Sequence, residues 1–352
     1  MSNPAAGQPA ELFSGPNTGL FGRRQRRARG ARIPVSVVTG FLGSGKTTLI
    51  RALLATPAGA NTAVVVNEYG EVGIDDALLR ASSDATVLLG NGCLCCTMRT
   101  DLQETLRALF ADRARGAVPS FQRVIIETSG LADPGPVLQT FASDRALGEE
   151  FHLQALIAVI DAPNGVRNLT DMPEARHQVM LSDRIVMTKI DLADAAATAA
   201  LTSQLRTLSP APQGVARNGV IDPAFLLEEA ADLPDLAKGM HAHDHAHADG
   251  VASFTLFFDR PLRWAVFEQA MAVLTALRGA DLLRVKGLVA VEGCRGPVVV
   301  HAVQHTAHRP VELEAWPTDD RRSRLVFIAR NLGEHEIRPL FQAVAGVAGG
   351  AG

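Results

Sequence analysis

A glycine-rich turn between a strand-like and a helix-like segment constrains the fold of this chain more than any other feature. Residues 33–39 are mostly apolar, as in a buried parallel strand. The sequence GFLGSGKT follows at positions 40–47, and a helical pattern continues to position 54. This order fits the G-x-x-x-x-G-K-[ST] pattern, in which backbone N–H groups surround phosphate oxygens between a strand and a helix. We therefore expect an ordered nucleotide-binding domain to begin at Ile33.

Each position of this turn has an expected part in binding phosphate. Glycines let the anion approach the backbone, and the following helix directs its positive N-terminal end at the same anion. Lys46 can reach the β- and γ-phosphates and is a candidate catalytic residue, while Thr47 can give its hydroxyl to Mg²⁺. We expect Thr48 to lie near the α-phosphate. The candidate nucleotide contacts of the turn are Gly40, Gly43, Ser44, Gly45, Lys46, Thr47 and Thr48.

Strand-like and helix-like segments alternate from position 33 to about position 210. Alternation of this kind predicts an α/β domain whose mostly parallel sheet has helices on both faces. Near position 210 the alternation fades. Further strands are expected at 63–66, 86–89, 124–126, 155–160 and 184–187, with helices at 101–110 and 195–208.

The chain divides into four expected segments. A basic tail at 1–32 has a composition typical of disorder, the nucleotide-binding domain spans 33–231, and a His-rich linker covers 232–250. Residues 251–349 predict a smaller C-terminal α+β domain. Its strands are expected at 252–258, 283–291, 297–303 and 324–329, and its helices at 263–277 and from 334 onward.

A second phosphate-side motif, Glu127-Thr128-Ser129-Gly130, ends the strand expected at 124–126. An acidic residue at the carboxyl end of a neighbouring strand is placed to act on the Mg²⁺ side of a nucleotide. Glu127 is therefore the second candidate catalytic residue, and the N–H of Gly130 is a candidate donor to a γ-phosphate. An ordinary strand-end acid is the alternative.

The segment Thr188-Lys189-Ile190-Asp191 follows the strand at 184–187 and resembles the Asn-Lys-x-Asp guanine reader of GTPases. The Asp191 carboxylate can accept two N–H bonds from guanine, a donor pair that adenine lacks. The aliphatic stem of Lys189 can lie over the base. Thr188 stands where asparagine is usual, which we expect to weaken one contact. A polar strand end is the alternative.

Three thiols lie within four positions, at Cys93, Cys95 and Cys96. They precede a helical pattern, and a helix N-terminus favours the metal-binding thiolate. Soft thiolates suit Zn²⁺ or Cu⁺, and tetrahedral zinc would take a fourth ligand such as Glu68 or water. An incomplete thiolate site is what a protein that hands its metal on would need. Small buried hydrophobes and a redox pair are the alternatives, and the isolated Cys294 is expected in the core.

A histidine run with the sequence HAHDHAH lies in the expected linker. Neutral imidazoles bind zinc and nickel, so the run predicts auxiliary metal capture, with a solvated linker as the alternative. The candidate auxiliary ligands are His241, His243, His245 and His247.

Composition limits the remaining classes. With 47% hydrophobic residues the chain can build a large core, and no apolar stretch is long enough for a membrane-spanning helix. The clustered cysteines do not make a disulfide framework and no secretory signal is visible, so we expect a cytoplasmic protein. The formal net charge of −3 combines a tail of six arginines and one acid with an acidic body. An acidic body is a poor nucleic-acid binder, so we expect no nucleic-acid partner, and without a spanning segment we expect no membrane partner. A basic tail that touches nucleic acid or an anionic surface is the alternative to a flexible solvated tail.

Taken in order, these motifs resemble the CobW-type branch of the metal-linked GTPases, a class that includes the urease and hydrogenase nickel-insertion GTPases. The resemblance implies a P-loop GTPase domain, a CobW-type C-terminal domain and a GTP-hydrolysing metallochaperone, commonly zinc-linked. Some members of the family are linked to cobalt for cobalamin synthesis or to nitrile hydratase activation, so Co²⁺ is the alternative metal. The resemblance covers about 33–345 and adds to the motifs above Asn67-Glu68-Tyr69-Gly70-Glu71 with Asp75, Ala132-Asp133-Pro134, Asp161, Leu283-Arg284-Val285-Lys286-Gly287 and Trp316.

Together the motifs predict a metal switch. GTP and Mg²⁺ would order the segments at 67–75 and 127–130, and the thiols lie between these segments in the sequence. Hydrolysis would then free the metal to a client metalloprotein reached through the C-terminal domain. Three alternatives stay open: an ATP-using kinase or ATPase, a non-enzymatic metal store, and a regulatory GTPase indifferent to metal. The sequence also leaves open a homo-oligomer.

Overall fold

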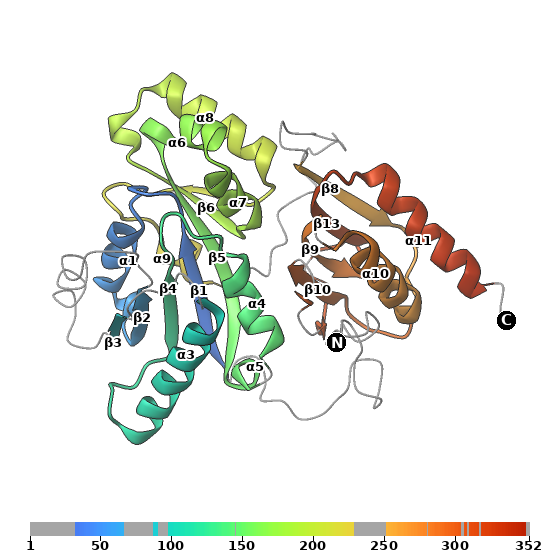
Figure 1. Cartoon of the computed structure of the whole chain (residues 1–352), viewed down its shortest axis with the longest axis horizontal. Coiled ribbons are helices and arrows are strands. Elements are labelled where there is room, and N and C mark those ends of the chain that lie inside the picture. Colours follow the sequence, from blue (N-terminus) through green and yellow to red (C-terminus); the bar gives the residue numbers. More distant parts are fainter. Residues whose placement is uncertain are drawn as a thin grey trace, which may run out of the picture. The chain divides into compact units, whose positions relative to one another are not determined.

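The computed structural model describes residues 32–66, 87–90, 98–144, 146–228, 251–279, 281–303, 306–307, 310–316 and 318–349. The described residues form two compact units, one at 32–228 and one at 251–349, whose elements are labelled in Figure 1. The expected linker at 232–250 and the tail before Arg32 lie outside the described residues. No described helix is long and apolar enough to cross a membrane.

The first unit is built on a seven-stranded sheet in which all neighbouring strands are parallel. The strands lie in the order β3-β2-β4-β1-β5-β6-β7. The predicted parallel sheet is therefore confirmed. Its strands are β1 (Ile33–Thr39), β2 (Thr62–Val66), β3 (Val87–Gly90), β4 (Arg123–Glu127), β5 (Phe151–Asp161), β6 (Arg184–Thr188) and β7 (Gln213–Val215).

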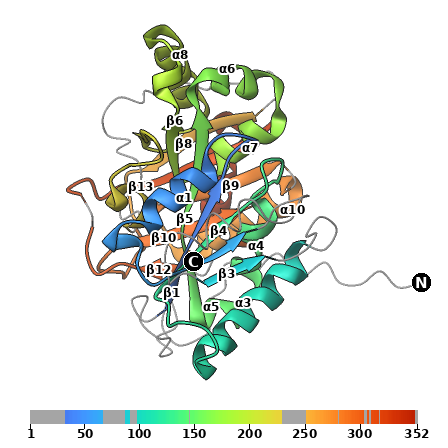
Figure 2. The ribbon, with the colours of Figure 1, turned by 90° about the vertical axis from the view of Figure 1, so that its left-hand side faces the viewer.

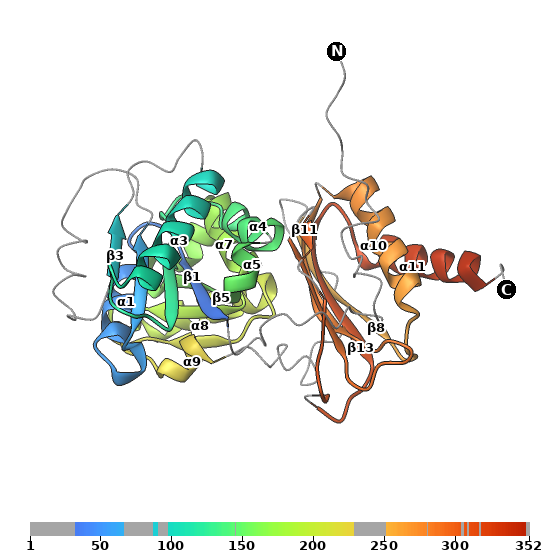
Figure 3. The same cartoon turned by 90° about the horizontal axis from the view of Figure 1, so that it is seen from below.

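Helices cover both faces of this sheet, as expected. The α1 and α9 helices pack on one face and α6, α7 and α8 on the other, and Figure 3 shows α1 and α9 on the side opposite α3 and α4. Alternate residues of β5 join the two cores, Ile157 on one face and Ala158 on the other, which explains the uninterrupted apolar run. The helices are α1 (Lys46–Leu54), α3 (Met98–Arg115), α4 (Gly135–Ser143), α5 (Leu147–Glu150), α6 (Ala162–Asp171), α7 (Pro173–Leu181), α8 (Ala195–Leu208) and α9 (Pro223–Leu227), with the 3-10 turns η3 (Pro57–Gly59) and η4 (Ile190–Leu192).

The carboxyl ends of the central strands meet at one edge of the sheet. Strand β1 lies between β4 and β5, and its register pairs Val38 with Glu127. Beyond β5, Asp161 pairs with Thr188 at the end of β6. Parallel strands end at the same edge, so the turn after β1 lies beside the loops that follow β4 and β6 (Figure 2). Ligands of open α/β sheets bind at such an edge, where the order of the strands reverses.

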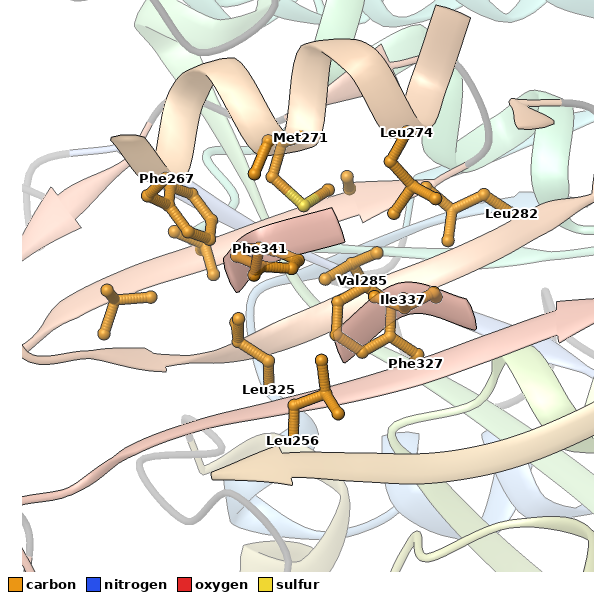
Figure 4. Packing of buried hydrophobic residues seen from close by; sticks show 14 of the residues in the cluster. Leu256, Phe267, Met271, Leu274, Leu282, Val285, Leu325, Phe327, Ile337 and Phe341 are labelled. Atoms are coloured by element: carbon orange, nitrogen blue, oxygen red, sulfur yellow. The ribbon is translucent and has the colours of Figure 1, made fainter. Parts of the chain in front are cut away.

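The second unit is an antiparallel sheet with two helices, which confirms the predicted smaller α+β domain. Its main strands lie in the order β11-β10-β9-β13-β8, and β12 pairs with β10. The helices α10 and α11 pack on one face of this sheet through Phe267, Met271, Ile337 and Phe341 (Figure 4). The elements are β8 (Val251–Phe258), α10 (Trp264–Arg278), β9 (Leu282–Val289), β10 (Val298–Val303), β11 (Thr306–Ala307), β12 (Val311–Glu312), β13 (Ser323–Arg330) and α11 (Glu334–Gly349).

Cys294 lies half-buried against the core of this second unit, close to where the sequence placed it. Burial, and secondly the negative charge of Glu312, raise the pKa of the Cys294 thiol to about 11. A raised pKa keeps the sulfur as a neutral thiol at pH 7, and a neutral thiol is a poor metal ligand. The surroundings of Cys294 therefore make it a poor candidate for a metal ligand.

The main departure from the predicted fold lies after position 210, where strand–helix alternation was expected to fade. It continues with β7, only three residues long, and the five-residue helix α9. The residues of β7 do not form the apolar run that is typical of a buried strand. The strand is the outermost one of the sheet and is stabilised by its parallel pairing with β6. Short edge strands of this kind depend on their neighbour rather than on their own sequence.

Candidate functional site

The turn at 40–47 has a backbone conformation that requires glycine. Gly40, Gly43 and Gly45 have φ angles of 146°, 71° and 96°, a region that residues with a side chain rarely adopt. At Gly40 a β-carbon would also lie only 2.2 Å from the carbonyl oxygen of Val159 on β5. The first helical hydrogen bond, from Leu49 N to Gly45 O at 2.9 Å, begins α1 directly after the turn. The turn is thus shaped as the phosphate-binding pattern predicts, with a helix N-terminus behind it.

Lys46 lies within the turn rather than in solvent. Its side chain is buried, and Nζ donates to the carbonyl oxygens of Gly40 at 2.9 Å and Phe41 at 3.3 Å. These carbonyls hold a positive charge at the place where a phosphate chain would lie. An ammonium group carries three donors on a flexible stem, so Lys46 can exchange carbonyl partners for phosphate oxygens without a change of fold.

Thr47, on the first turn of α1, contacts Glu127, the last residue of β4. The Thr47 hydroxyl donates to Glu127 Oε1 at 2.7 Å, and the carboxylate is buried at the end of its strand. A hydroxyl and a carboxylate are the hard oxygen ligands that Mg²⁺ prefers, and Mg²⁺ is usually held by one or two protein groups together with substrate phosphates. The two side chains therefore fit a magnesium ion bound beside phosphate.

The loop that follows Glu127 is held against the turn. Thr128 donates from its backbone N to Val38 O at 3.0 Å and from its hydroxyl to Thr39 Oγ1 at 2.9 Å. Two residues later, a β-carbon on Gly130 would lie 2.6 Å from Leu42 Cδ2 and 2.8 Å from Leu42 N. Glycine is needed at 130 because the loop approaches the backbone of the turn this closely.

The candidate base-reading residues also contact the turn. The Thr188 hydroxyl donates to Ser44 O at 2.6 Å, and Lys189 Nζ donates to Gly43 O at 2.6 Å. Lys189 has a φ of 53°, which turns the chain so that Asp191 is exposed at the same edge. The hydroxyl of Thr188 thus connects β6 directly to the phosphate turn, although threonine replaces the usual asparagine.

A short turn at 217–220 is part of this edge and was not anticipated from the sequence. Arg217 and Val220 exchange backbone hydrogen bonds of 2.9 Å, with Asn218 and Gly219 at positive φ between them. A β-carbon on Gly219 would lie 2.7 Å from Thr48 O, so the turn packs on the first residues of α1. The Asn-Gly pair was a visible turn signal, but nothing in the sequence gave its partner.

The predicted transition-metal ligands Glu68, Cys93, Cys95 and Cys96 lie outside the described residues, as do His241, His243, His245 and His247. Within the described ranges no group of three His, Cys, Asp or Glu side chains could hold a metal ion. The thiol motif falls in sequence between β3, which ends at Gly90, and α3, which begins at Met98.

Comparison with known proteins identifies the family. The profile of the CobW/HypB/UreG nucleotide-binding domain matches residues 34–215, just over half of the chain. The chain belongs to the CobW/HypB/UreG family. The matched CobW/HypB/UreG region runs from β1 to the end of β7, and it includes the phosphate turn, the loop after β4 and the segment at 188–191, but not the turn at 217–220. Residues 251–345 match the cobalamin synthesis protein cobW C-terminal domain.

Individual relatives agree with this assignment. The zinc chaperone YjiA of Escherichia coli is 32% identical over 314 residues, which are 88% of this chain and 98% of YjiA. The zinc chaperone CobW of Pseudomonas aeruginosa is 30% identical over 347 residues, 87% of this chain and 90% of that protein. The crystal structure of Zn(II)-bound YjiA GTPase from E. coli superposes with a TM-score of 0.70 at 29% identity, covering 89% of this chain and 99% of YjiA.

Proposed function

We propose that this chain is a GTP-hydrolysing metallochaperone, which binds a transition metal, zinc first, at Cys93, Cys95 and Cys96 and delivers it to client proteins. The observation that carries the GTPase part is the 2.7 Å hydrogen bond from Thr47 to Glu127 beside the glycine turn. It joins a phosphate-binding turn to an acid on the neighbouring strand, the pair of groups that P-loop nucleotide hydrolases use on the Mg²⁺ side of the phosphates. The zinc part is supported by the thiol motif and by relatives named zinc chaperones.

In this proposal different groups of the chain bind different parts of the phosphate chain and its Mg²⁺. Lys46 exchanges the carbonyls of the turn for β- and γ-phosphate oxygens, and the backbone N–H groups at 40–45 bind the remaining oxygens. Thr47 and Glu127 would hold Mg²⁺, which neutralises charge on the phosphates. Gly130, packed against Leu42, offers a backbone N–H on the γ-phosphate side.

The metal part of the proposal rests on the chemistry of the thiols. Three thiolates with Glu68 or water as the fourth ligand would suit zinc, and an open position allows the metal to be passed on. Cobalt is the alternative cargo, and a metal store without catalysis is the alternative function. Free thiols of this kind are expected to work in a reducing compartment such as the cytoplasm. We place the client contact on the C-terminal domain.

A turnover assay tests the proposal as a whole. We expect phosphate release from GTP and much less from ATP, measured with and without Zn²⁺ or Co²⁺. A preference for ATP would favour a kinase or ATPase, and bound metal without turnover would favour a metal store. If neither metal changes the turnover rate or the nucleotide affinity, the result would favour a regulatory GTPase.

Nucleotide choice should depend on Asp191. Replacing Asp191 with alanine should weaken guanine-nucleotide binding by about 1–3 kcal/mol, because the base N–H donors lose their acceptor. Competitive binding of GDP and ADP measures the effect. Asp194→Ala is the matched control: Asp194 caps α8 by accepting from Ala197 N at 2.6 Å, so it should lower stability by about 1 kcal/mol and keep the guanine preference. A parent without that preference would contradict the base-reading role.

The histidine run should be dispensable for nucleotide chemistry. Changing His241, His243, His245 and His247 to glutamine should lower metal stoichiometry at pH 7 and leave basal GTP hydrolysis unchanged. Capture by the run should fade as the pH falls below about 6.5, because protonated imidazole cannot bind metal. Equilibrium dialysis against zinc at pH 7.5 and 5.5 provides the measurement. The same stoichiometry in parent and variant at pH 7.5 would reduce the run to a solvated linker.

A further inference from the structure

A buried glutamine that belongs to none of the sequence motifs contacts the loop at 127–133. Gln178 lies on α7 and is 1% exposed. Its side-chain Nε2 donates to Gly130 O and to Ala132 O, each at 3.1 Å. Both acceptors lie in the loop after β4, which is 48 and 46 residues before Gln178 in the sequence.

The chemistry of the two bonds fixes the orientation of the amide. A primary amide has two N–H donors on its nitrogen, and Gln178 uses one for each carbonyl. The reverse orientation would place the amide oxygen against two carbonyl oxygens, which repel it. Among the described residues, Gln178 Oε1 is buried and has no hydrogen-bond partner. The two donors of the amide are thus paired, whereas an apolar side chain of equal size would leave both carbonyls without them.

The bonds determine how the loop presents its backbone. In a planar trans peptide the C=O and the next N–H point in opposite directions. Carbonyls at Gly130 and Ala132 that face α7 therefore turn the N–H groups of Leu131 and Asp133 away from it. Gly130 also packs against Leu42 of the phosphate turn. The same residue therefore accepts a hydrogen bond from α7 and contacts the turn.

Helix α7 has two further connections to the nucleotide-binding residues. His177 places Nδ1 3.9 Å from Asp133 Oδ2, and Asp133 Oδ1 accepts from Gly135 N at 2.8 Å at the start of α4. The chain then passes from α7 into β6, whose last residue, Thr188, donates to the phosphate turn. Helix α7 thus connects the base-side strand with the phosphate-side loop.

We propose that Gln178 is a positioning residue for GTP hydrolysis, which fixes the 130–131 and 132–133 peptides of the loop on the γ-phosphate side and the packing of Gly130 against the phosphate turn. The inference rests on the proposed GTPase function. It assigns Gln178 an effect on the rate of the chemical step and on the distinction between GTP and GDP, because GDP lacks the γ-phosphate that this loop would contact.

The test compares Gln178→Met, which keeps the volume but has no N–H donor, with the parent and with Gln204→Met, the same change on α8. We expect Gln178→Met to lower kcat for GTP by about tenfold or more, with the Kd for GDP changed by less than about threefold. Its affinity for a non-hydrolysable GTP analogue should fall towards that for GDP. Gln204→Met should behave as the parent.

Two results would overturn the inference: an unchanged kcat in folded Gln178→Met, or equal losses of GDP and GTP-analogue affinity together with a lowered Tm. If Gln178→Met does not fold, Gln178→Glu decides, because it has nearly the same shape. Its kcat relative to the parent should be low at pH 8 and should rise as the pH falls and protonation restores one O–H donor. A ratio near one at every pH overturns the inference. A parent without GTP hydrolysis overturns the proposed function itself.

Discussion

Replacing Lys46 with methionine should abolish measurable GTP hydrolysis while the protein stays folded. The Lys46 ammonium, which donates to Gly40 O and Phe41 O, is a positive charge on the phosphate side of the turn. Removing one donor aimed at developing charge costs about 10²–10³-fold in rate. Lys46 is only 8% exposed, so methionine is the better substitution, because it keeps the buried aliphatic stem in place. Loss of the two carbonyl bonds should lower the free energy of unfolding by about 1–3 kcal/mol.

Lys189→Met provides the matched control. Its Nζ donates to Gly43 O, so it too removes an ammonium from the turn, but from the base side. We expect weaker guanine-nucleotide binding and a kcat within about threefold of the parent, since no transition-state charge develops at the base. Single-turnover phosphate release at saturating GTP separates the two variants. Lys46→Met with a rate close to that of the parent would contradict the assigned role, whereas Tm measurements identify a variant that is merely unfolded.

The parts of the fold with local signals could be predicted from the sequence. The predicted helices at 46–54 and 195–208 match α1 and α8, because one is fixed by the glycine turn before it and the other by the Asp194 cap and apolar spacing. Strand β5 extends beyond its apolar run and begins at Phe151. Its additional residues pair with the start of β1, and sequence patterns do not record that pairing.

The contacts within the site were much less predictable. Sequence order placed Glu127 and Thr188 at strand ends, but gave no reason for Gln178 or for the turn at 217–220. Gln178 lies 48 residues from Gly130, and its role follows from two hydrogen bonds made only in the folded chain. Thr188 was expected to make a weaker contact than the usual asparagine. Its short side chain nevertheless reaches Ser44 O, because the end of β6 lies close to the phosphate turn.

The described structure connects α3, the helix that follows the thiol motif in the sequence, with the helix that follows the phosphate loop. Helix α3 begins two residues after Cys96, and α4 begins five residues after Gly130. The two helices pack together, and Arg107 of α3 pairs with Asp144 at the end of α4 at 2.6 Å. We infer from this packing a route by which a shift of the loop at 127–133 reaches α3, which follows the thiols in the sequence. Packed helices of this kind carry coupling when they have two arrangements.

Zinc and GTP should therefore tighten each other's binding, and Cys95→Ser should remove this coupling. Linkage is reciprocal, so each ligand must change the affinity of the other by the same factor, typically about 5–150-fold or 1–3 kcal/mol. The serine variant should also lose high-affinity zinc, because a neutral hydroxyl does not replace a thiolate. Its affinity for Mg-GTP without zinc should stay near that of the parent, since the turn at 40–47 makes its contacts independently of the thiols.

The measurement is zinc affinity with GDP and with a non-hydrolysable GTP analogue, using a competing chelator. Cys294→Ser is the matched control, because Cys294 packs beside the core of the other unit and has its pKa raised to about 11. It should keep the full difference between the two nucleotide states. Equal zinc affinity in both states of the parent would contradict the switch and leave a GTPase that carries metal without controlling it. A difference that survives in Cys95→Ser would show that the coupled metal does not depend on Cys95.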